Sequence, residues 1–519
     1  MDPILTTVLI LGVAVVAFVT NRIPVGVVAV AVSVALWATG ILTLNEAMAG
    51  FGDPTVVFIA TLFIVSESLD GTGVTAWAGQ KVIALGGAGR ARLLTMIAVL
   101  VGVLTALISV NGAVAALIPV VVVVAVRVGM PPSQMLMPLA FAAHAGSMLA
   151  LTGTPVNIIV SEAAADAGER PFGFFEFSLV GLPLLTGTIL IIILVGRHLL
   201  PHVKPETLPP DVSAYARALR RDYELPDGME LIGVAAGVTE AVIPPRSPLI
   251  GTHLFAGQAT PSGDLVVLGV RRGGEELTGP DTALAVGDTV LLRGLWEDLE
   301  RHTAGDEVLV VASPEVLRRA VPLGRGAKRS LVILTVMVVL LATGAVPPTI
   351  AGLLAAGAVI LTGVLSPARA YRAISWTTVL LVAGMIPLST AFATTGTADM
   401  IATGLLDVVG DASPVLALLA MCVVTLVLGQ LISNTATVLI MVPIATVVAA
   451  ELEVSVLPFM MALAISGAAS FLTPVATAAN TMVMEPGGYK FSDYWKFGLP
   501  LVVLFLSVAV LWVPLIWPF

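Results

Sequence analysis

Long apolar runs recur along most of this 519-residue chain, and they constrain its fold more than any other feature. Clear examples are Ile4 to Val19, Val25 to Thr43, Ser178 to Val195 and Leu331 to Val346. Each approaches the roughly 20 residues that a helix needs to cross about 30 Å of hydrocarbon. Hydrophobic residues make up 57% of the chain and charged residues only 11%, which excludes an ordinary soluble domain. We therefore predict about eleven membrane-spanning helices.

Several classes of protein are disfavoured by what the sequence lacks. The first apolar run has no basic flank, so we do not expect a cleaved signal peptide. The single cysteine, Cys422, lies inside an apolar run and can form neither an intrachain disulfide nor a thiolate cluster. No basic tract indicates nucleic acid as a partner. No zinc-binding His-Glu helix, nucleophile elbow or carboxylate pair is present, so we predict neither an enzyme nor a bound cofactor.

Charge is concentrated in one internal segment, because residues 197–329 hold 15 of the 25 Lys and Arg residues. We therefore divide the chain into a first membrane half at 1–200, an insert at 201–328 and a second membrane half at 329–519. Basic residues flank the insert and place it in the cytoplasm by the positive-inside rule. The expected location is the cell membrane, as a multi-pass protein.

The insert shows the alternating apolar pattern of strands in the segments beginning at Glu240, Asp264 and Gly287, followed by a helix at Glu297–Arg301. Over about residues 232–302 it resembles the TrkA-C (RCK-C) regulatory domain. The matching phrases are Pro245-Arg-Ser-Pro-Leu-Ile-Gly, Arg271-Arg-Gly-Gly-Glu and Ala285-Val-Gly-Asp-Thr-Val-Leu. The resemblance implies regulation by a small-molecule ligand. A spacer that only dimerises is the alternative.

Polar interruptions stand at matched places in the two membrane halves. Ser109 precedes Pro119 by ten residues, and Ser433 precedes Pro443 by the same distance. We predict helical hairpins near 109–119 and 433–443, and broken helices near 144–157 and 466–480. Such paired interruptions are typical of inverted repeats in secondary transporters, whose substrates bind where helices break near the bilayer midplane.

Ion binding is the function that these interruptions favour. Pro and Gly in a membrane helix free backbone groups that lipid cannot satisfy. Helix N-termini offer N–H groups to an anion, whereas free carbonyls and Ser, Thr or Asn oxygens suit a hard cation. Close helix packing by small residues is the alternative for each single interruption. Matched positions in both halves favour a binding site.

Three phrases resemble the divalent anion:sodium symporter (DASS) family, in the branch that carries TrkA-C inserts. They are Ser433-Asn434-Thr435, Gly153-Thr154 with Asn157, and the segment from Pro486 to Tyr494. The resemblance spans nearly the whole chain. It implies an α-helical polytopic fold with two inverted repeats and re-entrant hairpins, working as an elevator-type homodimer. It also implies cation-coupled symport of sulfate or a di- or tricarboxylate.

Carried over by position, the resemblance implies a substrate site and a sodium site shared by both halves. The implied substrate-binding residues are Ser433, Asn434, Thr435, Ser109, Asn111, Thr154, Thr473 and Pro474. The implied sodium ligands are Ser433, Asn434, Gly153, Asn157 and Asn480. Two departures from the family pattern stand out. Val110 replaces an asparagine of the first hairpin, which weakens one cation site, and residues 476–480 read Ala-Thr-Ala-Ala-Asn, so the anion's identity cannot be copied.

Ionisable residues in membrane segments are functional candidates by default. His144 stands at the start of a broken stretch and belongs to the residue type that titrates near neutral pH. Glu67 lies near a helix end. Either residue could couple protons in place of the weakened sodium site, so the coupling ion is sodium or a proton. The alternatives are a buried, hydrogen-bonded histidine and a satisfied interfacial carboxylate.

Two other classes of function stay open. A membrane anion sensor would bind the anion without carrying it. An RCK-gated cation channel or antiporter would use the insert as its gate, although no Thr-Val-Gly-Tyr-Gly filter phrase is present. The function we expect is secondary active transport of a small divalent anion under control of the insert.

Overall fold

The computed structural model describes residues 2–20, 22–86, 89–203, 212–226, 229, 231–233, 236–277, 283–319, 323–324, 326–409 and 413–519. The chain divides into two compact units. The helical body comprises Met1–Glu67, Lys81–Leu208 and Val332–Phe519. The second unit comprises Ser68–Gln80 and Pro209–Leu331, and it contains the insert.

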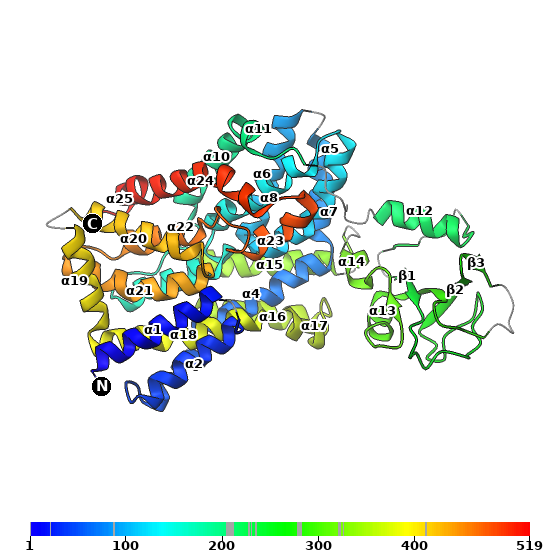
Figure 1. Cartoon of the computed structure of the whole chain (residues 1–519), viewed down its shortest axis with the longest axis horizontal. Coiled ribbons are helices and arrows are strands. Elements are labelled where there is room, and N and C mark those ends of the chain that lie inside the picture. Colours follow the sequence, from blue (N-terminus) through cyan, green and yellow to red (C-terminus); the bar gives the residue numbers. More distant parts are fainter. Residues whose placement is uncertain are drawn as a thin grey trace. The chain divides into compact units, whose positions relative to one another are not determined.

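The first half of the chain is helical almost throughout (Figure 1). In lipid, every backbone N–H and C=O must be satisfied within the protein, and a helix does this within a single segment. The helices are α1 (Pro3–Thr20), α2 (Val25–Ala38), α3 (Leu44–Met48), α4 (Pro54–Gly71), α5 (Val74–Gly86), α6 (Arg90–Leu107), α7 (Val110–Arg127), α8 (Leu136–Gly146), α9 (Pro155–Asp166), α10 (Ser178–Leu194) and α11 (Gly196–Leu199).

After the insert, the order of helices repeats. Helix α7 begins at Val110 and α21 at Asn434, 324 positions later, while α9 and α23 begin at Pro155 and Ala478, 323 positions apart. The predicted inversion of the second half stays a prediction. The helices are α15 (Ala327–Thr343), α16 (Pro348–Leu361), α17 (Pro367–Ala373), α18 (Trp376–Thr395), α19 (Thr397–Val409), α20 (Pro414–Gly429), α21 (Asn434–Glu451), α22 (Leu457–Ala468), α23 (Ala478–Gly487), α24 (Tyr494–Ser507) and α25 (Val513–Ile516).

Among the described residues, six helical segments are long and apolar enough to cross a membrane, and six shorter apolar helices accompany them. The prediction of a multi-pass α-helical membrane protein is therefore confirmed. Several predicted spans are shorter in the structure than in the sequence. The run from Val25 to Thr43 gives only the 14-residue helix α2, because the chain turns at Gly40, whose φ is +73°.

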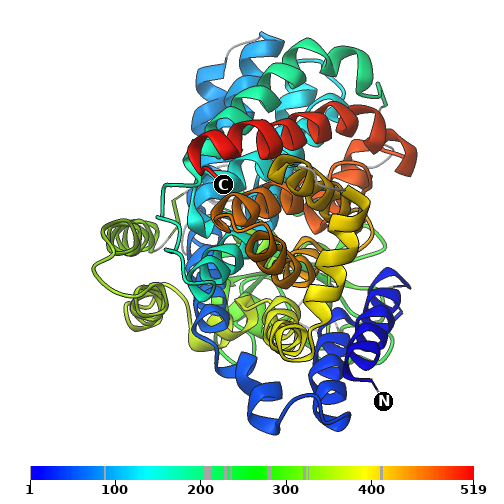
Figure 2. The same ribbon diagram turned by 90° about the vertical axis from the view of Figure 1, so that its left-hand side faces the viewer.

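Helices of the two halves pack closely together in the helical body. Helix α18 lies along α2 in both views (Figures 1 and 2). The Ser33 hydroxyl donates to the carbonyl of Gly384 at 2.9 Å. A Cβ on Gly384 would lie 2.6 Å from the carbonyl of Ala29, so only glycine permits this approach. Small residues at helix contacts are typical of membrane proteins.

The insert contains an antiparallel sheet with the strand order β3-β2-β4-β1-β5. The predicted strands and the predicted helix are confirmed, while β3 and β5 are two-residue strands that the sequence did not reveal. The elements are α12 (Val212–Asp222), β1 (Ala236–Val242), β2 (Leu265–Arg272), β3 (Glu275–Glu276), β4 (Thr289–Leu295), α13 (Trp296–His302), β5 (Leu309–Val310) and α14 (Pro314–Arg319).

Adjacent residues of a strand point to opposite faces of a sheet. Each face of this sheet packs against its own group of apolar side chains. Leu219 of α12 packs with Val238 and Leu291 on one face. Val290 and Trp296 belong to the larger core on the other face. The insert therefore has two apolar cores of its own.

A buried carboxylate anchors the turn before β4. Arg272 donates to Asp288 at 2.7 and 2.8 Å, and the backbone N–H of Ala285 donates to the same carboxylate at 2.7 Å. The Arg272 guanidinium holds the pKa of Asp288 below its usual range, and the Ala285 N–H acts in the same direction.

Candidate functional site

The tips of two helical hairpins are formed in the same way. The Ser109 side chain accepts a hydrogen bond from the Gly112 N–H at 3.2 Å and caps α7. The Ser433 side chain accepts one from the Ala436 N–H at 3.3 Å and caps α21. Serine is a preferred N-cap because its oxygen satisfies an N–H that the helix leaves unpaired. Each hairpin therefore presents a capped helix N-terminus at its tip.

Two broken helices are also matched. Thr154 caps α9 by accepting from the Val156 N–H at 3.4 Å, and Thr477 caps α23 by accepting from the Asn480 N–H at 3.3 Å. The sequence pattern instead paired the two Thr-Pro dipeptides and so matched Thr154 with Thr473. The structure corrects this pairing, because proline at the first helical position is replaced in the second half by Ala478.

Two buried asparagines brace the broken helices. Asn157 donates from Nδ2 to the carbonyls of Ser147 and Ala150, both at 2.9 Å. Asn480 donates to the carbonyls at the matched positions, ten and seven residues earlier, at 2.7 and 3.2 Å. Both asparagines are fully buried. Neither amide oxygen receives a hydrogen bond of good geometry from the described residues. These oxygens are acceptors that lack donors.

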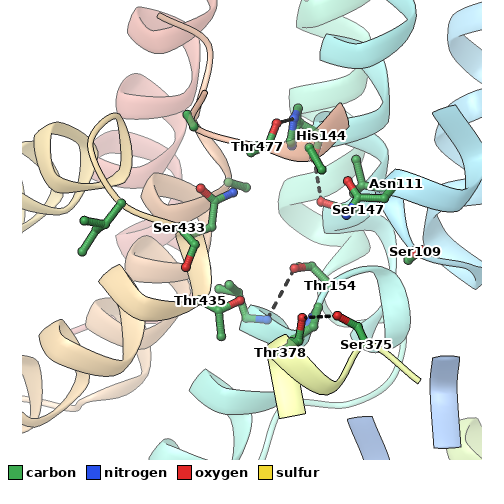
Figure 3. A pocket seen from close by; sticks show the side chains of 18 of the residues that line it. Ser109, Asn111, His144, Ser147, Thr154, Ser375, Thr378, Ser433, Thr435 and Thr477 are labelled. Atoms are coloured by element: carbon green, nitrogen blue, oxygen red, sulfur yellow. Dashed lines mark hydrogen bonds between the residues drawn. The ribbon is translucent and has the colours of Figure 1, made fainter. Parts of the chain in front are cut away.

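One cavity of about 750 Å³ lies among these four helix N-termini. In Figure 3, Ser433 and Thr435 stand on one side of it and Ser109 and Asn111 on the other. The described residues that line it include no Asp, Glu, Lys or Arg. Each helix N-terminus carries a partial positive charge of roughly half an elementary charge. The cavity is therefore suited to an anion that neutral donors hold.

The structure brings most of the predicted site residues together at this cavity. The predicted residues that line it are Ser109, Asn111, His144, Gly153, Thr154, Ser433, Asn434 and Thr435. The others do not line it: Asn157 and Asn480 lie behind the broken helices, and Thr473 donates to the Gln430 carbonyl at 3.3 Å. Pro474 is buried, and its carbonyl accepts from Thr481 at 2.8 Å.

Glu67 lies in α4, outside the cavity lining. Its carboxylate pairs with Arg369 of α17 at 3.1 Å, and the two side chains are 15% and 12% exposed. This geometry supports the satisfied carboxylate that the sequence left as the alternative to proton coupling.

The two hairpins differ at one matched position. Asn434 accepts from the Ser470 hydroxyl at 2.5 Å. The first hairpin has Val110 at this position, and the Ser147 hydroxyl, the counterpart of Ser470, donates instead to the carbonyl of His144 at 2.8 Å. The second hairpin therefore has a side-chain amide directly after its capping serine, whereas the first hairpin has its amide one residue later, at Asn111.

Sequence reasoning missed several residues that line the cavity. Thr477 would have been found from its distance to the hairpin serine, which is 44 residues in the second half and 45 between Ser109 and Thr154 in the first. Ser375 and Thr378 hydrogen-bond to each other at 2.9 Å at the start of α18. No sequence signal marked this pair, because they belong to a helix outside the hairpins.

A multi-pass protein whose repeated halves direct four helix N-termini into one cavity, with no Asp, Glu, Lys or Arg among its described lining residues, has the architecture of a membrane transporter. Residues 15–421 and 409–519 match the family model described as "Citrate transporter" (CitMHS). The chain therefore belongs to the citrate transporter family. This is a family of transporters and not of enzymes.

Relatives with transporter names support this assignment. The chain is 30% identical to the "Uncharacterized transporter YfbS" of Escherichia coli, over 98% of each chain. It is 28% identical to "Sodium/sulfate cotransporter 2" of Chlamydomonas reinhardtii, over 52% of this chain and 32% of that one. The solved YdaH transporter of Alcanivorax borkumensis matches with a TM-score of 0.51 at 14% identity, over 93% and 88% of the two chains. This structural likeness shows the fold alone.

Proposed function

We propose that this chain is a secondary active transporter that carries sulfate or a di- or tricarboxylate across the membrane together with sodium. The observation that supports this proposal most is the convergence of the N-termini of α7, α9, α21 and α23 on one cavity, whose described lining has no Asp, Glu, Lys or Arg. N–H and O–H donors at helix N-termini bind oxyanions without a basic residue.

The anion would contact the hairpin tips directly. Ser433, Asn434 and Thr435 would bind it from the second half, and Ser109, Asn111 and Thr154 from the first. The family name points to a carboxylate and the algal relative's name to sulfate. Both are oxyanions that accept several hydrogen bonds at once, so the cavity's donors suit either.

Sodium fits the donorless oxygens better than a proton does. A buried acceptor without a donor costs about 1–3 kcal/mol, which a hard cation offsets because it prefers oxygen ligands. Asn157 and Asn480 offer such oxygens, and Gly153, Ser433 and Asn434 would complete the cation ligands. No described carboxylate lines the cavity to carry a proton instead.

The remaining features of the proposal concern architecture. The hairpins would be re-entrant within two inverted repeats, and the protein would work as an elevator-type homodimer. The insert, a TrkA-C-like domain at about 232–302, would lie in the cytoplasm and regulate transport by binding a small molecule. The boundaries at 1–200, 201–328 and 329–519 stay predictions.

The decisive experiment measures uptake of labelled sulfate, succinate and citrate into proteoliposomes, with a sodium gradient and a pH gradient imposed separately. We expect one of these anions to accumulate under the sodium gradient, and Asn434→Ala to abolish this uptake. Thr446→Ala is the matched control, because Thr446 lies on the same helix and donates only to the Val442 carbonyl. Anion binding without counterflow would instead indicate a sensor, and accumulation under the pH gradient alone would overturn sodium coupling.

A further inference from the structure

The imidazole of His144 lies at the junction of the two repeated halves. His144 belongs to α8 of the first half and is 3% exposed. Its Nε2 lies 3.2 Å from the Oγ1 of Thr477, the cap of α23 in the second half (Figure 3). The ring packs edge-on against Phe471, with centroids 5.8 Å apart. These contacts fix the direction in which Nε2 points.

The direction of the hydrogen bond between His144 and Thr477 depends on which ring nitrogen carries the hydrogen. An imidazole with its hydrogen on Nε2 donates to the Thr477 oxygen, whereas one with its hydrogen on Nδ1 accepts the hydroxyl hydrogen at Nε2. The two tautomers therefore point the Thr477 hydroxyl in different directions.

With the hydrogen on Nε2, only one direction is left for the Thr477 hydroxyl. Its oxygen then accepts from the backbone N–H of Asn480 at 3.3 Å and from Nε2–H of His144 at 3.2 Å. A hydroxyl oxygen has two lone pairs, and these two donors occupy both. The hydroxyl hydrogen must then be donated elsewhere. Thr477 lines the cavity, so the cavity is the direction that remains.

We propose that His144 is neutral, carries its hydrogen on Nε2 and acts as a positioning residue that makes the Thr477 hydroxyl a donor to the transported anion. This inference rests on the proposed function, because it assigns a role within the same anion site. No described acidic side chain pairs with the imidazole, and the four helix N-termini around the cavity oppose a positive charge on it. His144 therefore acts through its N–H rather than by carrying a proton.

The first half offers a natural comparison. Thr154 caps α9 as Thr477 caps α23, and it also lines the cavity. The position that matches His144, 323 residues later, is Gly467, which has no side chain to orient Thr154. A Cβ on Gly467 would lie 2.6 Å from a Val438 methyl group, so this site has no room for a ring. Only the second-half cap is oriented by an imidazole.

The test is a double-mutant cycle on binding of sulfate and citrate, measured by calorimetry at saturating sodium on the full chain in detergent. We expect His144→Phe, which keeps a ring but removes the donor, to weaken anion binding by about tenfold or more. His144→Gln, which restores an N–H donor, should recover most of the loss. Thr477→Val should cost a similar factor, and His144→Phe added to it should cost little more, since the two residues act as one unit. Thr154→Val combined with His144→Phe should be additive.

Two further readouts separate positioning from a structural role. The concentration of sodium that gives half-maximal thermal stabilisation should change by less than about twofold in His144→Phe. In protein labelled with ¹⁵N-histidine, the NMR signal that disappears in His144→Gln belongs to His144. Its ¹⁵N chemical shifts in the wild-type protein should be those of a neutral ring protonated at Nε2. Additive effects of His144 and Thr477, or a ring protonated at Nδ1, would overturn the inference. Wild-type protein that binds the anion but does not transport it would refute the proposed transport and leave this inference intact.

Discussion

Asn157 makes in the first half the same two side-chain hydrogen bonds that Asn480 makes in the second, to carbonyls ten and seven residues earlier. Each amide thereby holds the broken segment before its helix in a fixed shape. Because both hydrogens are used, each amide oxygen is turned away from these carbonyls and has no well-placed donor. One residue in each half thus combines a structural task with a candidate cation ligand.

Replacing either asparagine should therefore affect stability and sodium dependence together. Asn157→Ala or Asn480→Ala removes two buried hydrogen bonds to backbone carbonyls, so we expect a loss of about 1–3 kcal/mol in the free energy of unfolding. The sodium concentration for half-maximal transport should rise in both variants. Thermal unfolding measures the loss of stability, and uptake at varied sodium concentration measures the change in sodium dependence. Thr446→Ala is again the control, and an unchanged sodium response in both variants would remove these oxygens from the cation site.

An amide at the first-hairpin position that matches Asn434 should strengthen sodium dependence. Val110→Asn would place a side-chain amide where Asn434 stands in the second hairpin, within the region that also contains Ser147. We expect the half-maximal sodium concentration to fall by a few-fold, as one added oxygen ligand would produce. Val110→Ala controls for the change in volume. A sodium response that is the same in both variants would show that the first hairpin does not bind the cation.

Local signals made the hairpin tips predictable from the sequence. Ser109 and Ser433 cap their helices by contacts within three residues, so the serine and the apolar run after it contain the information. The strands β1, β2 and β4 were likewise visible, because alternation of apolar residues is local. The two-residue strands β3 and β5 have no such pattern and form only by pairing with β2 and β1.

Contacts between distant segments were not predictable in this way. Thr477 was not predicted because the Thr-Pro pattern pointed to Thr473, and its contact with His144 joins residues 333 positions apart. Ser375 and Thr378 reach the cavity only because α18 packs along α2 and α21. The partner of Glu67, Arg369, is 302 positions distant in the chain. These positions depend on tertiary packing, which a single sequence does not reveal.

The insert should lose stability in acid through Asp288. Its pKa in the folded protein lies below the unfolded value of about 3.9, chiefly because Arg272 donates to the carboxylate. A group with a lowered pKa adds stability that is fully present above the unfolded value and is lost as the pH falls through the folded value. Hydrogen exchange in β4, corrected for intrinsic rates, should therefore show weaker protection at pH 3 than at pH 6.

Asp288→Asn is the matched variant for this pH dependence. It keeps the shape of the side chain but removes the charge, so protection of β4 should already be reduced at pH 6 and should change less on acidification. Asp264→Asn is the control, because Asp264 is partly exposed and lies away from the Arg272 pair. Equal responses of the two variants would contradict the role assigned to Asp288.

The ion pair between Glu67 and Arg369 should support folding rather than proton coupling. Glu67→Gln leaves the mostly buried Arg369 without its partner charge, and breaking such a pair costs about 3–5 kcal/mol. We expect a lower unfolding temperature but an unchanged ratio of anion to sodium in the protein that remains folded. The charge swap Glu67→Arg with Arg369→Glu should recover part of the stability. If Glu67 carried a proton, Glu67→Gln would uncouple transport from a pH gradient while leaving stability nearly intact, and the swap would not restore coupling.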